Sequence, residues 1–180
     1  MTTTNDRTWL PTSEPCFVCG EKNDAGIKTQ FYVEDGRVKA PLEAKPHHCG
    51  YHNVVHGGIV AAIMDETMGW AAARAIGRMC FTGELTIRYL RPTPGGCRLT
   101  VSAEVGRIGK RLVTAKGVLE DGAGIVYAKG EGKFVPLSVE DTLAVDDALI
   151  YRGGEEQVFA ALRDTAEHDN TIPARIPPSK

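Results

Sequence analysis

The pattern of hydrophobic and polar positions predicts a hairpin, then one long helix, then several strands. Alternating apolar residues over positions 27–34, the turn Asp35-Gly36 and a second alternating stretch to Leu42 predict a β-hairpin. The paired glycines Gly57-Gly58 open a proline-free run over 59–76 that is apolar on most faces. Such a run predicts a helix that other elements enclose.

The chain after this helix supplies elements that can enclose it. Apolar and polar residues alternate over 82–90 and 98–108, and the stretches 111–119 and 124–135 flank a turn at Asp121-Gly122. Short links between these stretches would make neighbouring strands antiparallel. The sequence therefore predicts an α+β fold, in which one long central helix is wrapped by a curved antiparallel β-sheet.

The periodicity also divides the chain into three parts. Residues 1–15 are polar and without periodicity, so we expect a flexible N-terminal arm. Residues 16–136 form the predicted domain, and 137–180 form a C-terminal extension. The extension is expected to be partly helical, because 155–168 places apolar residues on one face, whereas the proline-rich tail 172–178 cannot be helical.

Charge and composition narrow the possible partners and location. The 180 residues contain 21 Lys and Arg against 23 Asp and Glu, a net charge of −2 that favours neither nucleic acid nor an anionic membrane as partner. The longest apolar stretch, 57–64, is short of the ~18–20 residues of a membrane-spanning helix, and the N-terminus lacks a signal peptide's apolar core. We therefore expect a cytoplasmic protein, whose five cysteines are reduced thiols or metal ligands.

The segment from His56 to Asp65 carries the candidate chemistry. Two glycines at a helix start let a ligand approach the backbone, and the unpaired N–H groups of the first turn can bind an anion or a developing oxyanion. Asp65 follows two turns later among small residues, where a carboxylate is costly to bury unless it has a role. The alternatives are a surface carboxylate at Asp65, a capping or packing role for His56, and a plain turn at the glycines. For Glu66, we expect exposure to solvent or pairing with Arg74.

Helix geometry bears on how such a site is assembled. Gly57 and Asp65 are eight residues apart, or ~12 Å along a helix. One reacting carbonyl needs its oxyanion donor and its activating base each at ~3 Å. If both groups act on one carbonyl, they come from different subunits, which predicts a two-fold dimer with two equivalent sites.

Three segments together resemble a known family. They are His56-Gly57-Gly58 with an acid nine positions after the histidine, the strand TGELTIRYLRP at 82–92, and VGRIGKR at 105–111. Over residues 16–136 they are similar to the hotdog-fold acyl-CoA thioesterases of the phenylacetate-pathway and 4-hydroxybenzoyl-CoA type. The opening Cys16-Phe-Val-Cys19-Gly20 also resembles the start of many hotdog thioesterases.

The resemblance implies hydrolysis of an acyl-CoA thioester by a homodimer or a dimer of dimers, with CoA as part of the substrate and no other cofactor. By this resemblance Asp65 is the general base or nucleophile, the Gly57 N–H polarises the carbonyl, and His56 shapes the turn that Gly58 completes. Thr82 stands where the family often has a hydroxyl that holds the water. Asn53 is the candidate for a further polar partner of the carbonyl, because Gly50 stands where some relatives carry an amide.

Recognition of CoA phosphates is expected from a local basic patch. It consists of three residues around a glycine-bracketed turn, Arg107, Lys110 and Arg111. The alternative for this patch is a solvated hairpin tip. The acyl pocket would be lined by apolar residues of the helix and sheet, with Met68 and Trp70 as candidates.

Three other functions compete with hydrolysis. Cys16 and Cys19 could bind zinc with partners from His47, His48, Cys49 and His52, but this second set lacks a recognisable zinc-finger spacing, so we predict no metal. A non-catalytic acyl-CoA-binding protein of the same fold would gain nothing from Asp65. A hydratase would need a differently spaced acid and histidine, because here His56 precedes Asp65 at the helix entrance.

Overall fold

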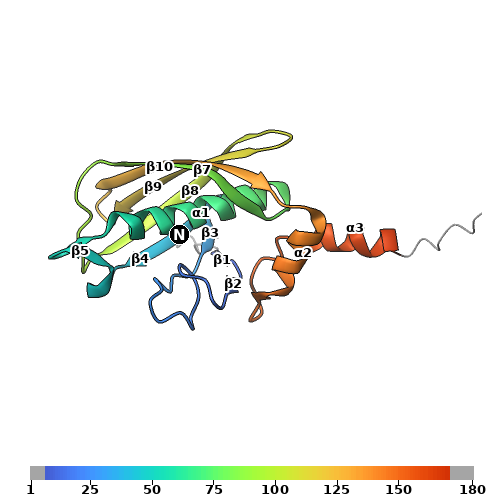
Figure 1. The fold of residues 1–180 in the computed structure, drawn as a ribbon, viewed down its shortest axis with the longest axis horizontal. Coiled ribbons are helices and arrows are strands. Elements are labelled where there is room, and N and C mark those ends of the chain that lie inside the picture. The colour runs from blue at the N-terminus through green and yellow to red at the C-terminus, as the bar shows by residue number, and fades with distance from the viewer. Residues whose placement is uncertain (1–6, 171–180) are drawn as a thin grey trace, which may run out of the picture.

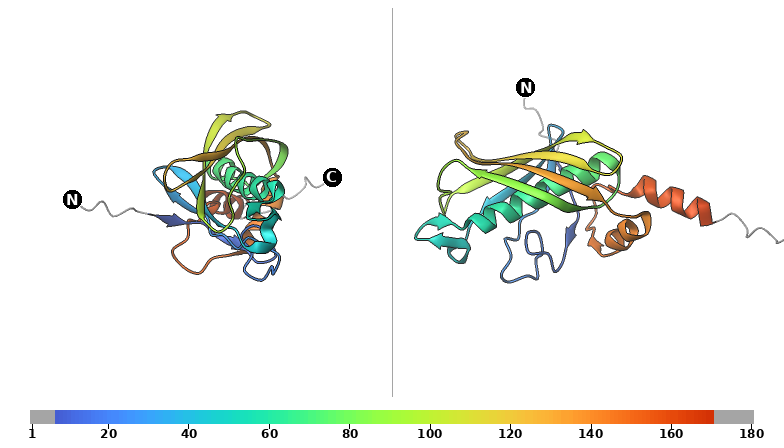
Figure 2. Two further views of the ribbon diagram at one scale, coloured as in Figure 1. Left: turned by 90° about the vertical axis from the view of Figure 1, so that its left-hand side faces the viewer. Right: turned by 45° about the horizontal axis from the view of Figure 1, so that its top comes forward.

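A computed structural model describes residues 7–170, with side chains up to residue 166. Its centre is α1 (Gly57–Ile76), which begins at the N-cap residue His56 and ends at Gly77 with a left-handed φ of 63°. The sheet curves around this helix, as the end-on view in Figure 2 shows. Buried residues such as Ile63, Met64 and Met68 fill the space between helix and sheet. The predicted α+β fold with an enclosed central helix is confirmed.

The main sheet has seven strands in the order β1-β3-β4-β8-β9-β10-β7. All pairings are antiparallel. The strands are β1 (Thr8–Trp9), β3 (Tyr32–Glu34), β4 (Arg37–Glu43), β7 (Cys80–Tyr89), β8 (Arg98–Ile108), β9 (Val113–Asp121) and β10 (Val126–Pro136). The predicted hairpin at Asp35-Gly36 joins β3 and β4, and the stretches predicted after the helix form β7 to β10.

The strand that follows α1 does not pair with its neighbour in sequence. β7 pairs with β10 at the edge of the sheet, whereas β8 lies between β4 and β9. The link between β7 and β8 therefore forms no hairpin, although the pairings of both strands are antiparallel as the short links predicted. The link 90–97 contains Pro92 and Pro94, which do not favour a tight hairpin turn, and it carries the chain across the sheet.

The N-terminal segment is more ordered than the sequence suggested. Over residues 7–15 it contains β1 and β2 (Thr12–Ser13), which pair with β3 and β11 (Leu149–Ile150), and Leu10 between them is fully buried. The expected flexible arm is therefore wrong for these residues, because two-residue strands are too short to produce a detectable alternation. Residues 1–6 lie outside the described residues.

The C-terminal extension contains two helices and packs onto the domain. It contains α2 (Val139–Asp147), which the pattern did not reveal, and α3 (Ala160–Asn170), which extends away from the sheet in Figure 1. Phe159, just before α3, is almost completely buried and stacks on Trp70 of α1 with ring centroids 6.5 Å apart. The proline-rich tail 172–178 lies outside the described residues.

Candidate functional site

The N-terminus of α1 is built as a turn with one free donor. His56 accepts a hydrogen bond at Nδ1 from the Gly58 N–H (2.9 Å), and its carbonyl accepts one from the Ile59 N–H (2.9 Å). Within residues 7–170 the Gly57 N–H has no hydrogen-bond acceptor. His56 therefore caps the helix, the Gly58 N–H is already used, and the Gly57 N–H remains for a ligand.

This free donor lies in a groove between two segments. The 3-10 helix η1 (Pro46–His48) leads into a small hairpin of β5 (Cys49–Tyr51) and β6 (Val54–Val55), and α1 follows directly. The groove has a volume of about 740 Å³ and is lined by this hairpin, His56, Gly57 and the end of β7 with residues 90–93. It is large enough to accept part of an extended ligand.

Tyr89 completes the turn from the opposite side of the groove. Its hydroxyl donates a hydrogen bond to the Gly57 carbonyl oxygen (2.7 Å), and burial raises the pKa of this hydroxyl. A Cβ at Gly57 would lie 3.4 Å from the Tyr89 ring, so this approach is close. Sequence reasoning missed the role of Tyr89, because its partner is 32 residues away in sequence.

Asp65 lies in the middle of α1 and is half-buried. The Thr82 hydroxyl donates a hydrogen bond to Asp65 Oδ1 (2.8 Å) from the start of β7. Burial raises the pKa of the Asp65 carboxyl above its ordinary value, and the Thr82 hydrogen bond lowers it in part. The structure thus brings together the acid and hydroxyl that the resemblance had paired.

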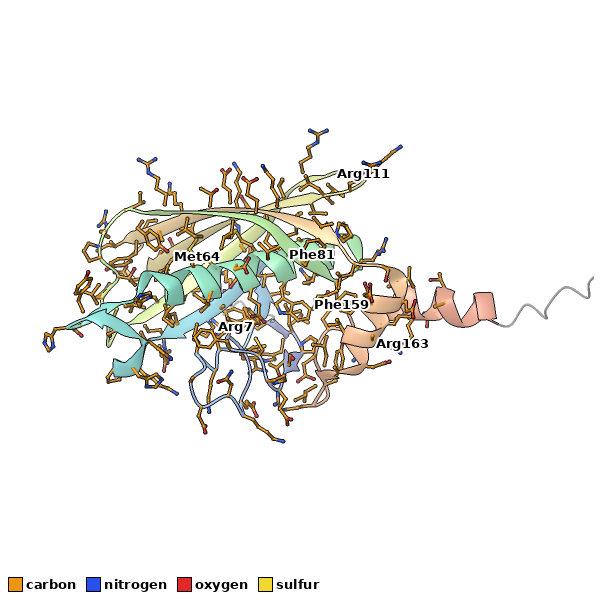
Figure 3. All side chains as sticks on the ribbon, viewed as in Figure 1. Arg7, Met64, Phe81, Arg111, Phe159 and Arg163 are labelled. Carbon is orange, nitrogen blue, oxygen red and sulfur yellow. The ribbon has the colours of Figure 1, made fainter. Side chains whose placement is uncertain are left out.

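The two halves of the candidate site lie at opposite ends of β7. Thr82 near its start contacts Asp65, whereas Tyr89 at its end contacts Gly57. Figure 3 shows Phe81, at the start of the strand, toward the end of the molecule that carries the C-terminal extension. With ~12 Å of helix between them, Gly57 and Asp65 of one chain do not meet.

The predicted CoA-binding residues are not gathered around the Gly57 groove. Asn53 has a left-handed φ of 59° in the β5–β6 turn and lines an adjacent hollow with Gly95 and Gly96. The basic patch Arg107, Lys110 and Arg111 is exposed at the β8–β9 tip, and Figure 3 shows Arg111 far from the β5–β6 end. Met68 and Trp70 are packed in the core, so neither lines this groove.

A second cluster of chemically active side chains surrounds Glu66, the residue after Asp65 in α1. Cys16 Sγ is 3.2 and 3.1 Å from the two Glu66 oxygens, and Cys19 Sγ is 3.4 Å from one of them. The expectation for Glu66 is therefore wrong: it faces the thiols, and Arg74 pairs with Glu156 at 2.9 Å. Sequence reasoning missed this contact, because 50 residues separate Cys16 from Glu66.

The protonation states of Cys16, Cys19 and Glu66 depend on one another. The hydrogen bond from Cys19, aided by backbone N–H groups, lowers the pKa of the Cys16 thiol to about 5. Burial, followed by the neighbouring Cys16, raises the pKa of Glu66 to about 8, and the pKa of Cys19 is also raised. Of these groups, Cys16 is therefore the one whose ionised form the surroundings favour.

The other zinc ligands considered from the sequence do not cluster with Cys16 and Cys19. They are His47, His48, Cys49 and His52. Among the described residues, the group of three or more side chains placed to hold a metal ion is Cys16, Cys19 and Glu66. His48 is buried and accepts a hydrogen bond at Nδ1 from the Lys45 N–H (3.2 Å), so it stabilises η1. The histidine-containing zinc site weighed from the sequence is therefore not formed.

Comparisons with known proteins identify the class. Residues 52–128 match the family described as the Thioesterase superfamily. The BH2602 protein from Bacillus halodurans, solved with CoA, is 33% identical with a TM-score of 0.55, and the match covers 62% of this chain and 74% of that one. The PaaI protein of E. coli, from the phenylacetic acid degradation operon, is 22% identical with a TM-score of 0.58. This match covers 65% of this chain and 87% of that one, and it shows a shared fold. The chain belongs to the thioesterase superfamily and has its hotdog fold.

The chain is also similar to a protein named as an acyl-CoA thioesterase. Acyl-coenzyme A thioesterase THEM4 of Xenopus laevis is 27% identical over 109 residues, which are 59% of this chain and 49% of the relative. The chain thus matches about half the length of this relative. Within the described residues, no helix is long and apolar enough to cross a membrane.

Proposed function

We propose that the protein is an acyl-CoA thioesterase, which hydrolyses an acyl-CoA thioester to a free acid and CoA at sites shared between two subunits. The observation that carries the proposal is the placement of an acid with its hydroxyl partner at one end of β7 and of a free N–H donor at the other. Similarity to acyl-CoA thioesterases and to a CoA-containing relative supports the substrate class.

The edge position of β7 explains how two subunits complete each site. Within the described sheet, β7 pairs on one side with β10 and has no strand on the other. Two identical strands that pair about a two-fold axis run antiparallel, so the start of one lies beside the end of the other. Asp65 and Thr82 of one subunit then approach Gly57 of its partner, twice per dimer.

The chemistry requires a polarised carbonyl and an activated oxygen nucleophile. The Gly57 N–H donates to the thioester oxygen as negative charge develops on it. Asp65, as a carboxylate, either removes a proton from the attacking water that Thr82 helps to hold or attacks the carbonyl itself. In either case one water is consumed, the carbon–sulfur bond breaks and CoA leaves as the thiol.

The basic patch supplies the proposed contact with the CoA phosphates. Among the described residues, Arg107, Lys110 and Arg111 form no ion pair with an acid, so their charges are available to an anion. The antiparallel arrangement also carries the β8–β9 tip of one subunit toward the β5–β6 end of the other. We also propose that Asn53 is the further polar partner of the thioester carbonyl. We propose a cytoplasmic location for the protein.

Two substitutions test the oxyanion donor without disturbing the helix. Gly57→Pro removes the N–H at the first helical position, where proline is tolerated, and His56 already has the extended backbone (φ −60°, ψ 135°) that precedes proline. Gly57→Ala is the matched control, because it keeps the N–H. We expect a loss of at least about 100-fold in thiol release for proline and a small effect for alanine.

The acid is tested in parallel. Asp65→Asn is expected to keep the fold and to reduce hydrolysis by at least about 100-fold. Near-normal thiol release by this variant would reject Asp65 as the base or nucleophile.

The non-catalytic alternative is tested with the wild type. A protein that binds acyl-CoA tightly but releases no thiol from acyl-CoAs ranging from short aliphatic to aryl would establish this alternative.

Mixing the two variants tests the sharing of the site. A hybrid of an Asp65→Asn chain and a Gly57→Pro chain contains one intact site, so a fully exchanged equal mixture recovers up to about one quarter of wild-type activity. The control is each variant mixed with itself. If the wild type is active, no recovery after demonstrated subunit exchange would exclude sharing.

A further inference from the structure

Outside the proposed active site, the Cys16, Cys19 and Glu66 cluster has the composition of a metal site. Two thiols three residues apart converge with a carboxylate from α1, and their donor atoms all lie within 4.8 Å of one another. The sulfur–oxygen separations are 3.1, 3.2 and 3.4 Å. A tetrahedral zinc ion with bonds of ~2.3 Å to sulfur and ~2.0 Å to oxygen separates these atoms by about 3.5 Å. The ligands therefore need little movement to bind it.

The turn that carries the two cysteines presents backbone donors to sulfur. The N–H groups of Val18 and Cys19 point at Cys16 Sγ (3.2 and 3.3 Å), and the Ser13 N–H points at Cys19 Sγ (3.5 Å). A Cβ at Gly20 would lie 2.4 Å from two carbonyl oxygens, so the turn closes only with glycine there. Such donors stabilise negative charge on sulfur, which is the form that binds a metal.

Charge balance also favours a cation in this position. Among the described residues, no lysine, arginine or histidine forms an ion pair with Glu66, and Arg74 on the same helix is engaged by Glu156. Cys19 is buried, whereas Cys16 and Glu66 are half-buried. A divalent ion would neutralise most of the charge of two thiolates and a carboxylate, and the partial exposure leaves room for water as a fourth ligand.

We propose that Cys16, Cys19 and Glu66 bind one zinc ion per chain, with a water molecule in the fourth position. The sequence alone argued against a metal, because it offered only histidines and a cysteine with unsuitable spacing as further ligands. The structure supplies a carboxylate instead. The ion would attach the segment around β2 to α1 at the residue next to Asp65, so that it positions the acid without contacting substrate.

The test is metal binding by the full chain after reduction and removal of bound metal. We expect one equivalent of Zn²⁺ per chain by elemental analysis, and one equivalent of Co²⁺ to produce a thiolate-to-cobalt charge-transfer band. Cys16→Ser, Cys19→Ser and Glu66→Gln should each weaken Zn²⁺ binding by more than the about 10–100-fold typical of an outer-shell partner. Cys97→Ser is the matched control, since its thiol donates a hydrogen bond to the Pro94 carbonyl and it does not belong to the candidate metal-binding group found among the described residues.

Each outcome decides the proposal, independently of thioesterase activity. The cobalt titration of the wild type needs no variant to fold, and a spectrum without the thiolate band overturns the site. A band that survives in the Cys16→Ser, Cys19→Ser double variant also overturns it, because other cysteines would then be the ligands. Binding of less than one tenth of an equivalent of zinc by the reduced protein would also overturn the proposal, because the thiol–carboxylate cluster would then be free of metal.

Discussion

At the scale of single residues, burial and the contact with Thr82 act in opposite directions on the charge of Asp65. The hydroxyl donates to Asp65 Oδ1 at 2.8 Å, so it stabilises the carboxylate relative to the neutral acid. Burial acts in the opposite direction and is the larger influence on the pKa. In the proposed mechanism hydrolysis depends on the charged form, so it should decrease as the pH falls through the pKa of Asp65.

Thr82→Val tests this balance. Loss of the hydroxyl removes the influence that lowers the pKa of Asp65, so the acidic limb of the pH–rate profile should move to higher pH. The measurement is kcat/KM for thiol release across the acidic range. Thr82→Ser keeps a hydroxyl and should keep the wild-type limb; an unchanged limb in the valine variant would show that the contact does not influence the acid.

Residues within one helix were accessible to sequence reasoning, and contacts between distant segments were not. The spacing of Gly57 and Asp65 follows from the rise of a helix, so it could be converted into a distance. The partners of Glu66 and Tyr89 depend on how Cys16 and the end of β7 fold back onto α1. Periodicity describes which face a residue occupies, but it does not say which distant segment covers that face.

At the scale of elements, the C-terminal extension stabilises the domain through one aromatic residue. Phe159 buries its ring against Trp70, which also contacts Phe31 with ring centroids 6.4 Å apart. We expect Phe159→Ala to lower the free energy of unfolding by about 3–5 kcal/mol, as is typical of large cavities in a core. Urea denaturation measures the change.

The matched control for Phe159 is its exposed neighbour Gln157. Gln157→Ala should stay within about 0.5 kcal/mol of the wild type. Equal stability of the two variants would mean that the extension contributes nothing to the core around Trp70.

The order of the strands was the least predictable feature at this scale. Alternation identified the positions of β7 to β10 to within about two residues, because one face of each strand packs against the core, although only partly buried residues do so in β7. It contained no information about pairing partners, so the placement of β7 beside β10 could not be read from it. Short strands such as β1 and β11 have too few residues to show alternation at all.

At the scale of the whole molecule, the free edge of β7 is the surface on which the proposed dimer depends. Phe81 on this strand is 53% exposed, and Ile108 at the β8–β9 tip is similarly exposed at 54%. Exposed apolar residues along an unpaired edge favour pairing with another strand. Because the proposed site needs two subunits, we expect assembly and activity to be lost together.

Phe81→Lys is expected to convert the dimer into monomers and to reduce hydrolysis by at least about 100-fold, because a charge would be buried in the interface. Light scattering coupled to size-exclusion chromatography measures the mass, and thiol release measures the activity. Val139→Lys is the control for an exposed apolar residue away from β7, because Val139 lies in α2 and is 40% exposed. A monomeric Phe81→Lys protein with full activity would contradict the shared site.

The stacking of Trp70 on Phe159 has a practical consequence. The chain has two tryptophans, of which Trp9 is partly exposed and Trp70 is buried beneath the extension. Detachment of the last helix would open the Trp70 indole to water while the β-sheet stayed intact. The protein therefore contains an intrinsic fluorescent reporter, whose emission distinguishes local opening at the carboxyl end from global unfolding without any added label.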